Sequence, residues 1–228
     1  MARAKERQNQ VQIDWFRKNG PVKLGIWNSY CWRTDPRLIV FMLSRYKFCA
    51  KMLADKKRVL EVGCGDAFGM NIVLQTVGSV HGVDFEPAVI EAARRRIKEE
   101  EQERFSLEVL DVTRKPAARK FDAAYSLDVI EHIPRSKEKI FMKNICASLK
   151  KEGVLIIGTP NLDASRHASP LSKIGHVNLK NAAGLRKLMG KYFQNVFNFS
   201  MNDEVVHTGF SPMAHYLFAM GVGKKGAA

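Results

Sequence analysis

The feature that most constrains the fold is a short apolar strand that runs directly into a glycine-rich turn. Residues 59–69 read VLEVGCGDAFG, with glycines at positions 63, 65 and 69. Glycine lets the backbone approach a ligand closely, and the helix that follows begins with free N–H donors. A strand, turn and helix in this order predict a parallel α/β sheet with a ligand site at the carboxyl end of the strand.

The chain on both sides of this turn alternates short apolar runs with amphipathic segments. Strands are expected at residues 58–62, 80–83, 106–110, 121–126, 153–158, 196–199 and 215–220. Helices are expected at residues 36–53, 69–76, 87–103, 137–149 and 182–191. This alternation predicts a doubly wound α/β sheet of seven strands, mostly parallel, with an antiparallel last strand.

The 228 residues fit one domain with extensions better than two full domains. We expect residues 36–228 to form that domain, with an acceptor-side loop at 161–181, which is long and polar for a connection. Residues 1–35 are basic and aromatic without a clean period, and we interpret them as an N-terminal extension or helical lid. Trp15, Trp27, Tyr30 and Trp32 would lie over the bound cofactor and exclude water.

Two acidic residues follow the next strands at spacings that suit a nucleoside. Asp84 ends the second expected strand, where a carboxylate accepts hydrogen bonds from ribose hydroxyls. Asp111 ends the third strand, where it can meet an adenine amino group. The glycine spacing is GxGxxxG, wider than the GxGxxG of dinucleotide enzymes, and Glu61 precedes the first glycine. A carboxylate there suits a cofactor with a cationic amino-acid end, which favours S-adenosylmethionine over NAD.

Four segments carry these features in order along the chain: Leu60–Gly65, Val83-Asp84, Leu110–Val112 and Phe121–Pro134. They closely resemble the successive motifs of class I S-adenosylmethionine-dependent methyltransferases, over residues 46–199. Within that family, the EH at 131–132, the TPN at 159–161 and the GHV at 175–177 resemble the ubiquinone-biosynthesis O-methyltransferase type and its glycan and natural-product relatives.

The resemblance implies a Rossmann-like fold and a cofactor site at the carboxyl ends of the first strands. The cofactor-binding residues that it implies are Arg45, Tyr46, Glu61, Gly63, Cys64, Gly65, Asp84, Phe85, Asp111, Val112 and Leu127. Arg45 begins an RYxF sequence that is similar to an element of some relatives, in which the arginine pairs with the methionine carboxylate. Its place on an otherwise apolar helical stripe also fits an arginine that only extends its head group to water.

The acceptor side of the site is expected to carry a general base, because a hydroxyl acceptor must lose its proton. Histidine suits this role near neutral pH, and the candidates are His207, His176 and His132. Each of the three also has a purely structural reading. Some relatives bind a divalent metal where this chain has Asp128, Glu131 and His132, although Asp128 replaces their usual glutamate. A metal is therefore a possibility here, but the less favoured one.

The function that we expect is transfer of a methyl group from S-adenosylmethionine to a small molecule, most simply to a hydroxyl. The net charge of +14, of which +10 lies before residue 59, suits an anionic acceptor or merely a solvated terminal region. N-methylation of a small molecule and RNA methylation remain alternatives. Against RNA, the chain has no NPPY-type tetrapeptide and no recognisable RNA-binding module. A non-catalytic cofactor-binding subunit is the third alternative.

Cysteine usage and the N-terminal sequence bear on location. The four cysteines are scattered without a CxxC pair, as in reduced cytoplasmic proteins. No apolar signal core follows Met1, and no apolar run is long enough to span a bilayer. We therefore expect a cytoplasmic protein, and oligomeric state is left open.

Overall fold

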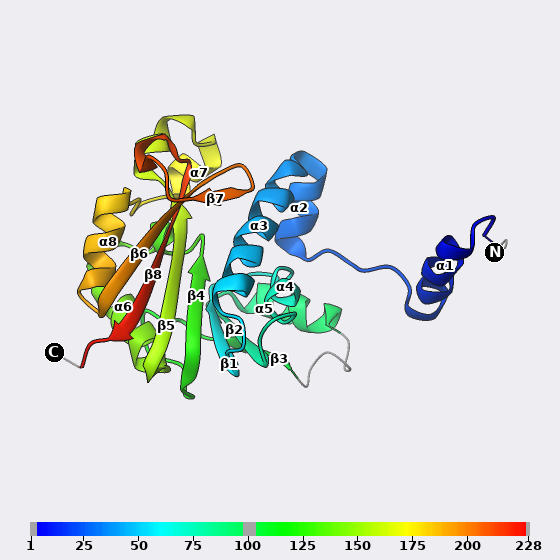
Figure 1. Cartoon of the computed structure of the whole chain (residues 1–228), viewed down its shortest axis with the longest axis horizontal. Coiled ribbons are helices and arrows are strands. Elements are labelled where there is room, and N and C mark those ends of the chain that lie inside the picture. Colours follow the sequence, from blue (N-terminus) through cyan, green and yellow to red (C-terminus); the bar gives the residue numbers. More distant parts are fainter. Residues whose placement is uncertain (1–3, 98–103, 227–228) are drawn as a thin grey trace.

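The computed structural model describes residues 4–97 and 104–226. They form one eight-stranded sheet with the strand order β3-β2-β1-β4-β5-β8-β6-β7 (Figure 1). The strands are β1 (Arg58–Val62), β2 (Ser79–Asp84), β3 (Phe105–Val109), β4 (Phe121–Leu127), β5 (Leu149–Pro160), β6 (Phe193–Asn202), β7 (Val205–His207) and β8 (Tyr216–Lys224).

Strands β1 to β5 are parallel, and β8 runs antiparallel between β5 and β6. β1 pairs with β2 on one side and with β4 on the other, so the direction of winding reverses at β1. In open α/β sheets, ligands bind at the carboxyl ends of the strands beside such a reversal. The topology alone therefore places a ligand site beyond the ends of β1 and β4.

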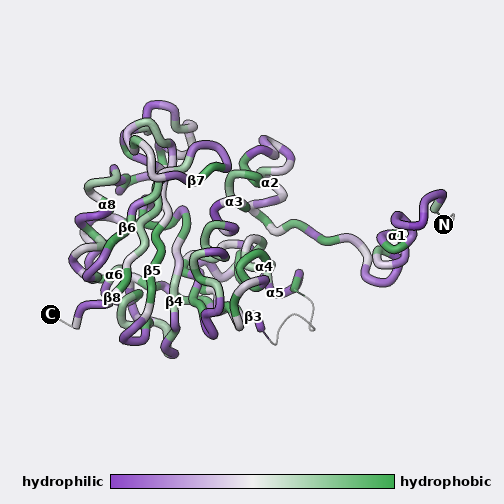
Figure 2. The backbone as a smooth tube through the Cα atoms, in the orientation of Figure 1, coloured by the Kyte–Doolittle hydropathy of each residue, from purple (hydrophilic) through white to green (hydrophobic). Residues whose placement is uncertain are grey.

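Helices cover both faces of the sheet, which confirms the doubly wound class. The helices are α1 (Arg7–Asn19), α2 (Ile26–Thr34), α3 (Arg37–Met52), α4 (Met70–Val73), α5 (Pro87–Arg96), α6 (Arg135–Ser148), α7 (Pro170–Gly175) and α8 (Ala182–Gly190). One apolar cluster packs α3, α4 and α5 on one face, and a second packs α6 and α8 on the other. Alternate residues of β5 enter different clusters, since Ile156 belongs to the first and Ile157 to the second. In Figure 2, hydrophobic and hydrophilic stretches alternate along the strands and helices, and β5 contains a hydrophobic stretch.

The structure corrects the expected number of strands from seven to eight. The additional strand is β7, three residues long, which pairs with the end of β6 in a hairpin. The sequence predicts no strand there, because three residues are too few to show a period. The 161–181 segment likewise contains a 3₁₀-helix at Leu162–His167 and α7. A helix was expected over residues 87–103, and α5 ends at Arg96. Residues 98–103 of the expected helix lie outside the described residues.

The N-terminal region contains two helices with different relations to the sheet. α2 packs beside α3, whereas α1 has no buried residue and lies well apart from the domain (Figure 1). None of the described helices combines the length and the apolar character that crossing a membrane requires.

Candidate active site

The glycine-rich turn after β1 is shaped by backbone conformations that favour glycine. Gly63 has φ +77° and Gly65 has φ +53°, both in the left-handed region. A Cβ atom on Gly63 would overlap the Val129 side chain, and one on Gly65 would lie 3.2 Å from Cδ1 of Trp27. The turn is therefore closely approached from the segment after β4 on one side and from α2 on the other.

Two carboxylates at the carboxyl ends of β2 and β3 stand beside this turn. Asp84 accepts hydrogen bonds from the backbone N–H of Gly65 at 3.0 Å and of Glu86 at 3.0 Å. Asp111 uses one oxygen, Oδ1, to accept from both the backbone and the hydroxyl of Thr113, at 2.8 and 2.7 Å. Both carboxylates are thus fixed in orientation, Asp84 by the turn after β1 and its own loop and Asp111 by its own loop, at the positions where the sequence motifs predict contacts to a nucleoside.

Glu61 lies directly beneath the turn and is 1% exposed. The hydroxyls of Tyr46 and Tyr125 donate to its two oxygens at 2.6 and 2.8 Å. Burial raises the pKa of this carboxyl to about 8, against the lowering effect of the two hydrogen bonds. Tyr46, which the RYxF sequence singled out, therefore acts in this structure through Glu61.

Arg45 of α3 and Asp128, which directly follows β4, form an ion pair. Nη1 of Arg45 donates to both carboxylate oxygens of Asp128, at 2.8 and 2.7 Å, and the guanidinium lies over the Tyr216 ring at 3.9 Å. Asp128 has φ +56°, so a strained residue presents this carboxylate. Nε of Arg45 is buried and has no hydrogen-bond partner among the described residues. The reading of Arg45 as merely reaching water does not describe this geometry.

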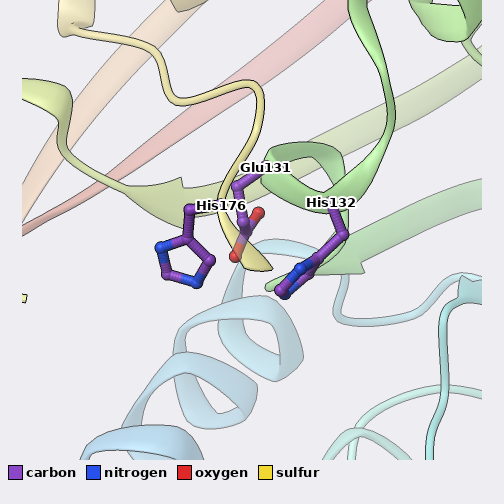
Figure 3. A group of neighbouring side chains, drawn as sticks. All are labelled: Glu131, His132 and His176. Carbon is purple, nitrogen blue, oxygen red and sulfur yellow. The ribbon is translucent and has the colours of Figure 1, made fainter. Parts of the chain in front are cut away.

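Glu131, His132 and His176 come together at the same edge of the sheet (Figure 3). One potential ligand atom from each lies within 4.8 Å of those from the other two, and the two imidazole rings are 5.0 Å apart. Glu131 and His132 follow β4, and His176 is brought to them because the backbone N–H of Asn178 donates to the Glu131 carbonyl at 2.9 Å. We call these three residues the Glu–His–His cluster.

Hydrogen bonding within the cluster leaves specific atoms unused. Nδ1 of His132 donates to the Gly175 carbonyl at 3.0 Å, so Nε2 is the nitrogen that the neutral ring would offer to a ligand. Oε2 of Glu131 accepts from the Thr159 hydroxyl at 3.0 Å, while Oε1 of Glu131 and Nδ1 of His176 are buried without a described partner. Buried polar atoms are normally paired, so these two atoms mark a place where a ligand or ion would bind.

The surroundings of Glu131 and His176 favour the neutral form of each of these two groups near neutral pH. Burial, reinforced by Asp128, raises the pKa of Glu131 to about 8. Burial, reinforced by His132, lowers the pKa of His176 below the ordinary value. His176 is therefore an unprotonated imidazole at neutral pH, which is the form that accepts a proton.

His207, the third candidate base, lies in the β6–β7 hairpin. Its Nδ1 accepts from the backbone N–H of Gly209 at 2.9 Å, and its Nε2 pairs with Oδ1 of Asn202 at 2.9 Å. Both ring nitrogens are thus used within the hairpin, which does not favour a catalytic role. Asn161 of the TPN sequence is also structural, because its amide donates to the carbonyls of Ser211 and Ala214.

The remaining predicted cofactor residues line the same edge in two ways. Cys64, Val112 and Leu127 are buried, whereas Phe85 is 69% exposed just beyond β2. All four residues lie in, or directly beside, the sequence motifs described above.

A contact between α2 and the glycine-rich turn was not anticipated from the sequence. The backbone N–H and side-chain amide of Asn28 donate to Asp66 at 3.0 and 2.7 Å, and Asn28 is 3% exposed. A Cβ atom on Gly25 would overlap Asp66, so the chain enters α2 in direct contact with the turn. Asp66 lies within the glycine motif, but the spacing of that motif does not predict a hydrogen-bond partner 38 residues earlier in the chain.

Known proteins resemble the chain in sequence and in fold. A family model described as a methyltransferase domain matches residues 53–200. A ubiquinone biosynthesis O-methyltransferase of Coxiella burnetii is 28% identical over 119 residues, 51% of this chain and 50% of that protein. A probable S-adenosylmethionine-dependent methyltransferase of Mycolicibacterium smegmatis is 28% identical over 69% of this chain and 61% of its own length. The chain thus spans about half the length of the first of these relatives.

Solved structures share the fold at lower identity. The methyltransferase domain of bacterial CtHen1 has a TM-score of 0.66 at 20% identity, covering 80% of this chain and 98% of that one. The N-methyltransferase NodS of Bradyrhizobium japonicum, in complex with S-adenosyl-L-homocysteine, has a TM-score of 0.60 at 19% identity, covering 84% and 91%. With the sheet order, the glycine-rich turn and the family match together, the chain belongs to the methyltransferase-domain family and has the fold of class I methyltransferases.

Proposed function

We propose that the protein transfers the methyl group of S-adenosylmethionine to a hydroxyl of a small molecule, with the His132–His176 pair as general base. The observation that carries the proposal is the pair of buried atoms without a described partner, Oε1 of Glu131 and Nδ1 of His176, beside the imidazole of His132. They lie at the carboxyl edge of the sheet, where the motifs predict the cofactor.

The cofactor would bind through groups whose geometry is already set. The backbone of the turn at Gly63 and Gly65 would lie against the amino-acid part of the cofactor, and Asp84 has carboxylate lone pairs for the ribose hydroxyls. Asp111 would receive the adenine amino group on the oxygen that Thr113 does not use. Nε of Arg45 is buried and unpaired, so a cofactor carboxylate would give it a partner.

The chemistry is an in-line displacement at the methyl carbon. The acceptor oxygen forms a bond to the methyl group while the carbon–sulfur bond breaks, and the sulfonium becomes the neutral thioether S-adenosylhomocysteine. The acceptor proton passes to an imidazole of the pair, which becomes an imidazolium. The lowered pKa of His176 keeps that ring free of a proton before the reaction.

Replacement of each histidine tests the base. We expect His132→Ala or His176→Ala to lower kcat by about 10²–10⁴-fold while cofactor affinity is retained, because a general base contributes that factor. His207→Ala is the matched control and should keep wild-type turnover. Wild-type kcat in both His132→Ala and His176→Ala would show that neither ring is the base.

A second arrangement at the same cluster is a divalent metal. Its oxygen and two imidazole nitrogens suit Zn²⁺, Mn²⁺ or Fe²⁺ better than Mg²⁺. The predicted ligand Asp128 fits less well than His176, because both Asp128 oxygens are bonded to Arg45. A bound metal would lower the pKa of an acceptor hydroxyl. Loss of turnover in EDTA, with recovery on adding one of these metals, would support this arrangement over the base.

The relatives also include N-methyltransferases, so the acceptor atom needs its own test. We expect phenols and other hydroxyl compounds to be methylated in preference to matched amines. Mass spectrometry of the products from paired phenol and aniline acceptors would decide between them.

A further inference from the structure

The position of His176 in the Glu–His–His cluster depends on the loop that carries it. His176 directly follows α7, whereas Glu131 and His132 come from the segment after β4 (Figure 3). Nδ1 of His176 is buried without a hydrogen-bond partner among the described residues, so this atom does not hold the ring. The ring is therefore oriented largely by the backbone of the loop, and the contacts of that loop decide where it lies.

Asn178, two residues after His176, is the buried anchor of the loop. Its backbone N–H donates to the carbonyl of Glu131 at 2.9 Å, and its side-chain amide donates to Oε2 of Glu138 at 2.9 Å. Glu131 lies in the 3₁₀ turn after β4 (Ile130–His132), and Glu138 lies in the first turn of α6. The loop that carries one histidine is thus joined at two points to the segment that carries the other.

Lys180 completes a network with Asn178 and Glu138. Its amine lies 2.7 Å from Oε2 of Glu138, and it also donates to the side-chain oxygen and to the carbonyl of Asn178. The side chains of Lys180 and Glu138 are only 14% and 18% exposed, so solvent screens this ion pair weakly. Burial alone would raise the pKa of Glu138, but the hydrogen bonds from Lys180 and Asn178 bring it below its ordinary value. Glu138 is therefore a carboxylate at neutral pH.

The backbone of Lys180 is fixed from another side, where β5 ends. Its carbonyl accepts from the N–H of Leu162 at 2.9 Å, and Lys180 forms a parallel bridge with Asn161. The amine therefore reaches Glu138 from a fixed starting point. The network connects α6, the segment after β5 and the loop of His176.

We propose that Glu138, Asn178 and Lys180 are positioning residues that hold His176 in the Glu–His–His cluster. The inference rests on the proposed role of His176 in methyl transfer. Loss of the Lys180 amine leaves a partly buried carboxylate without its cation, which is costly, so the carboxylate turns to water and releases Asn178. A displacement of about 1 Å in a reacting group lowers turnover by about 10²-fold. A network that only stabilised the fold would not change the turnover of the folded molecules.

Two substitutions of Lys180 separate positioning from stability. We expect Lys180→Met to lower kcat by about 10²-fold, with little change in the KM for S-adenosylmethionine, at a temperature where the variant is folded. Lys180→Arg should restore most of the lost turnover, because it keeps a charged donor. Lys150→Met is the matched control, since it breaks an ion pair with Asp122 at the amino ends of β4 and β5, and it should keep wild-type kcat.

Hydrogen exchange and histidine NMR report the position of the loop without any turnover. In Lys180→Met, the amide of Asn178 should lose at least about 10-fold of its protection, and the ring signals of His176 should shift, while the amides of β4 and β5 stay protected. Glu138→Gln keeps an oxygen for Asn178 but no charge for Lys180. It should show the same changes at smaller size, and it provides the test if Lys180→Met does not fold.

Unchanged exchange at Asn178 and unchanged His176 signals in the folded variants would overturn the proposal. So would wild-type kcat in Lys180→Met when His176→Ala has lost turnover, because the network would then only stabilise the fold. Wild-type kcat in His176→Ala would refute this ring as the base. It would leave the exchange and NMR measurements to decide the positioning, so the two proposals fail separately.

Discussion

Glu61 shows how burial changes the behaviour of a single residue. It has a folded-state pKa of about 8, above the ordinary 4.5, because it is enclosed beneath the glycine-rich turn. A carboxyl whose pKa is raised by folding stabilises the protein fully below its unfolded pKa. That contribution is lost as the pH rises from about 4.5 to about 8. Stability should therefore fall across the range in which most proteins are at their most stable.

We predict that the cofactor-free protein loses on the order of 2–4 kcal/mol of unfolding free energy between pH 5 and pH 8. Glu131, which has a similar pKa, contributes to the same loss. Glu61→Gln should flatten the pH dependence, measured by urea unfolding at several pH values. The exposed Glu204→Gln should reproduce the wild-type slope, and an equally steep slope in Glu61→Gln would contradict the assignment.

At the scale of elements, α2 depends on one buried contact. Asn28 supplies two donors to Asp66, and without the side-chain donor one oxygen of Asp66 loses a partner, at a cost of about 1–3 kcal/mol. We predict that Asn28→Ala increases protease cleavage within residues 20–34 by about 10-fold and weakens cofactor binding, because Trp27 leaves the turn. Ser29→Ala, in the same helix, is the control. Unchanged cleavage in Asn28→Ala would show that α2 is held by other contacts.

The elements differ in how far the sequence predicts them, and the reasons are physical. β1 and the turn after it are local, since an apolar run and glycines at fixed spacing determine both. β7 is three residues long and is formed only by its pairing with β6, so no local sequence pattern predicts it. His132 and His176 were each candidates, but they meet through a loop contact between Asn178 and Glu131. The pairing of Asp128 with Arg45, 83 residues apart, is likewise invisible to spacing and changes the expected metal ligands.

At the scale of the whole molecule, the proposed cofactor site is bordered by segments that lie far apart in the sequence. The turn after β1, the ends of β2 and β3, the start of α2 and the Arg45 side chain of α3 all border it. A ligand that contacts all of them binds only the folded state and therefore raises the free energy of unfolding. The site residues favour S-adenosylhomocysteine over NAD, because the GxGxxxG spacing and the Glu61 carboxyl do not suit the binding of a pyrophosphate.

Thermal unfolding with each ligand measures this difference. At about 100 times its Kd, S-adenosylhomocysteine should add roughly 2.7 kcal/mol and raise the Tm by about 5–10 °C in a chain of this size. NAD at the same concentration should leave the Tm unchanged. Asp84→Ala should abolish most of the shift because the ribose loses its acceptor, while Glu204→Gln, remote from the turn in sequence and exposed, should keep it. A shift with NAD that matches the shift with S-adenosylhomocysteine would contradict the cofactor assignment, since it would mean that the adenosine part alone is recognised.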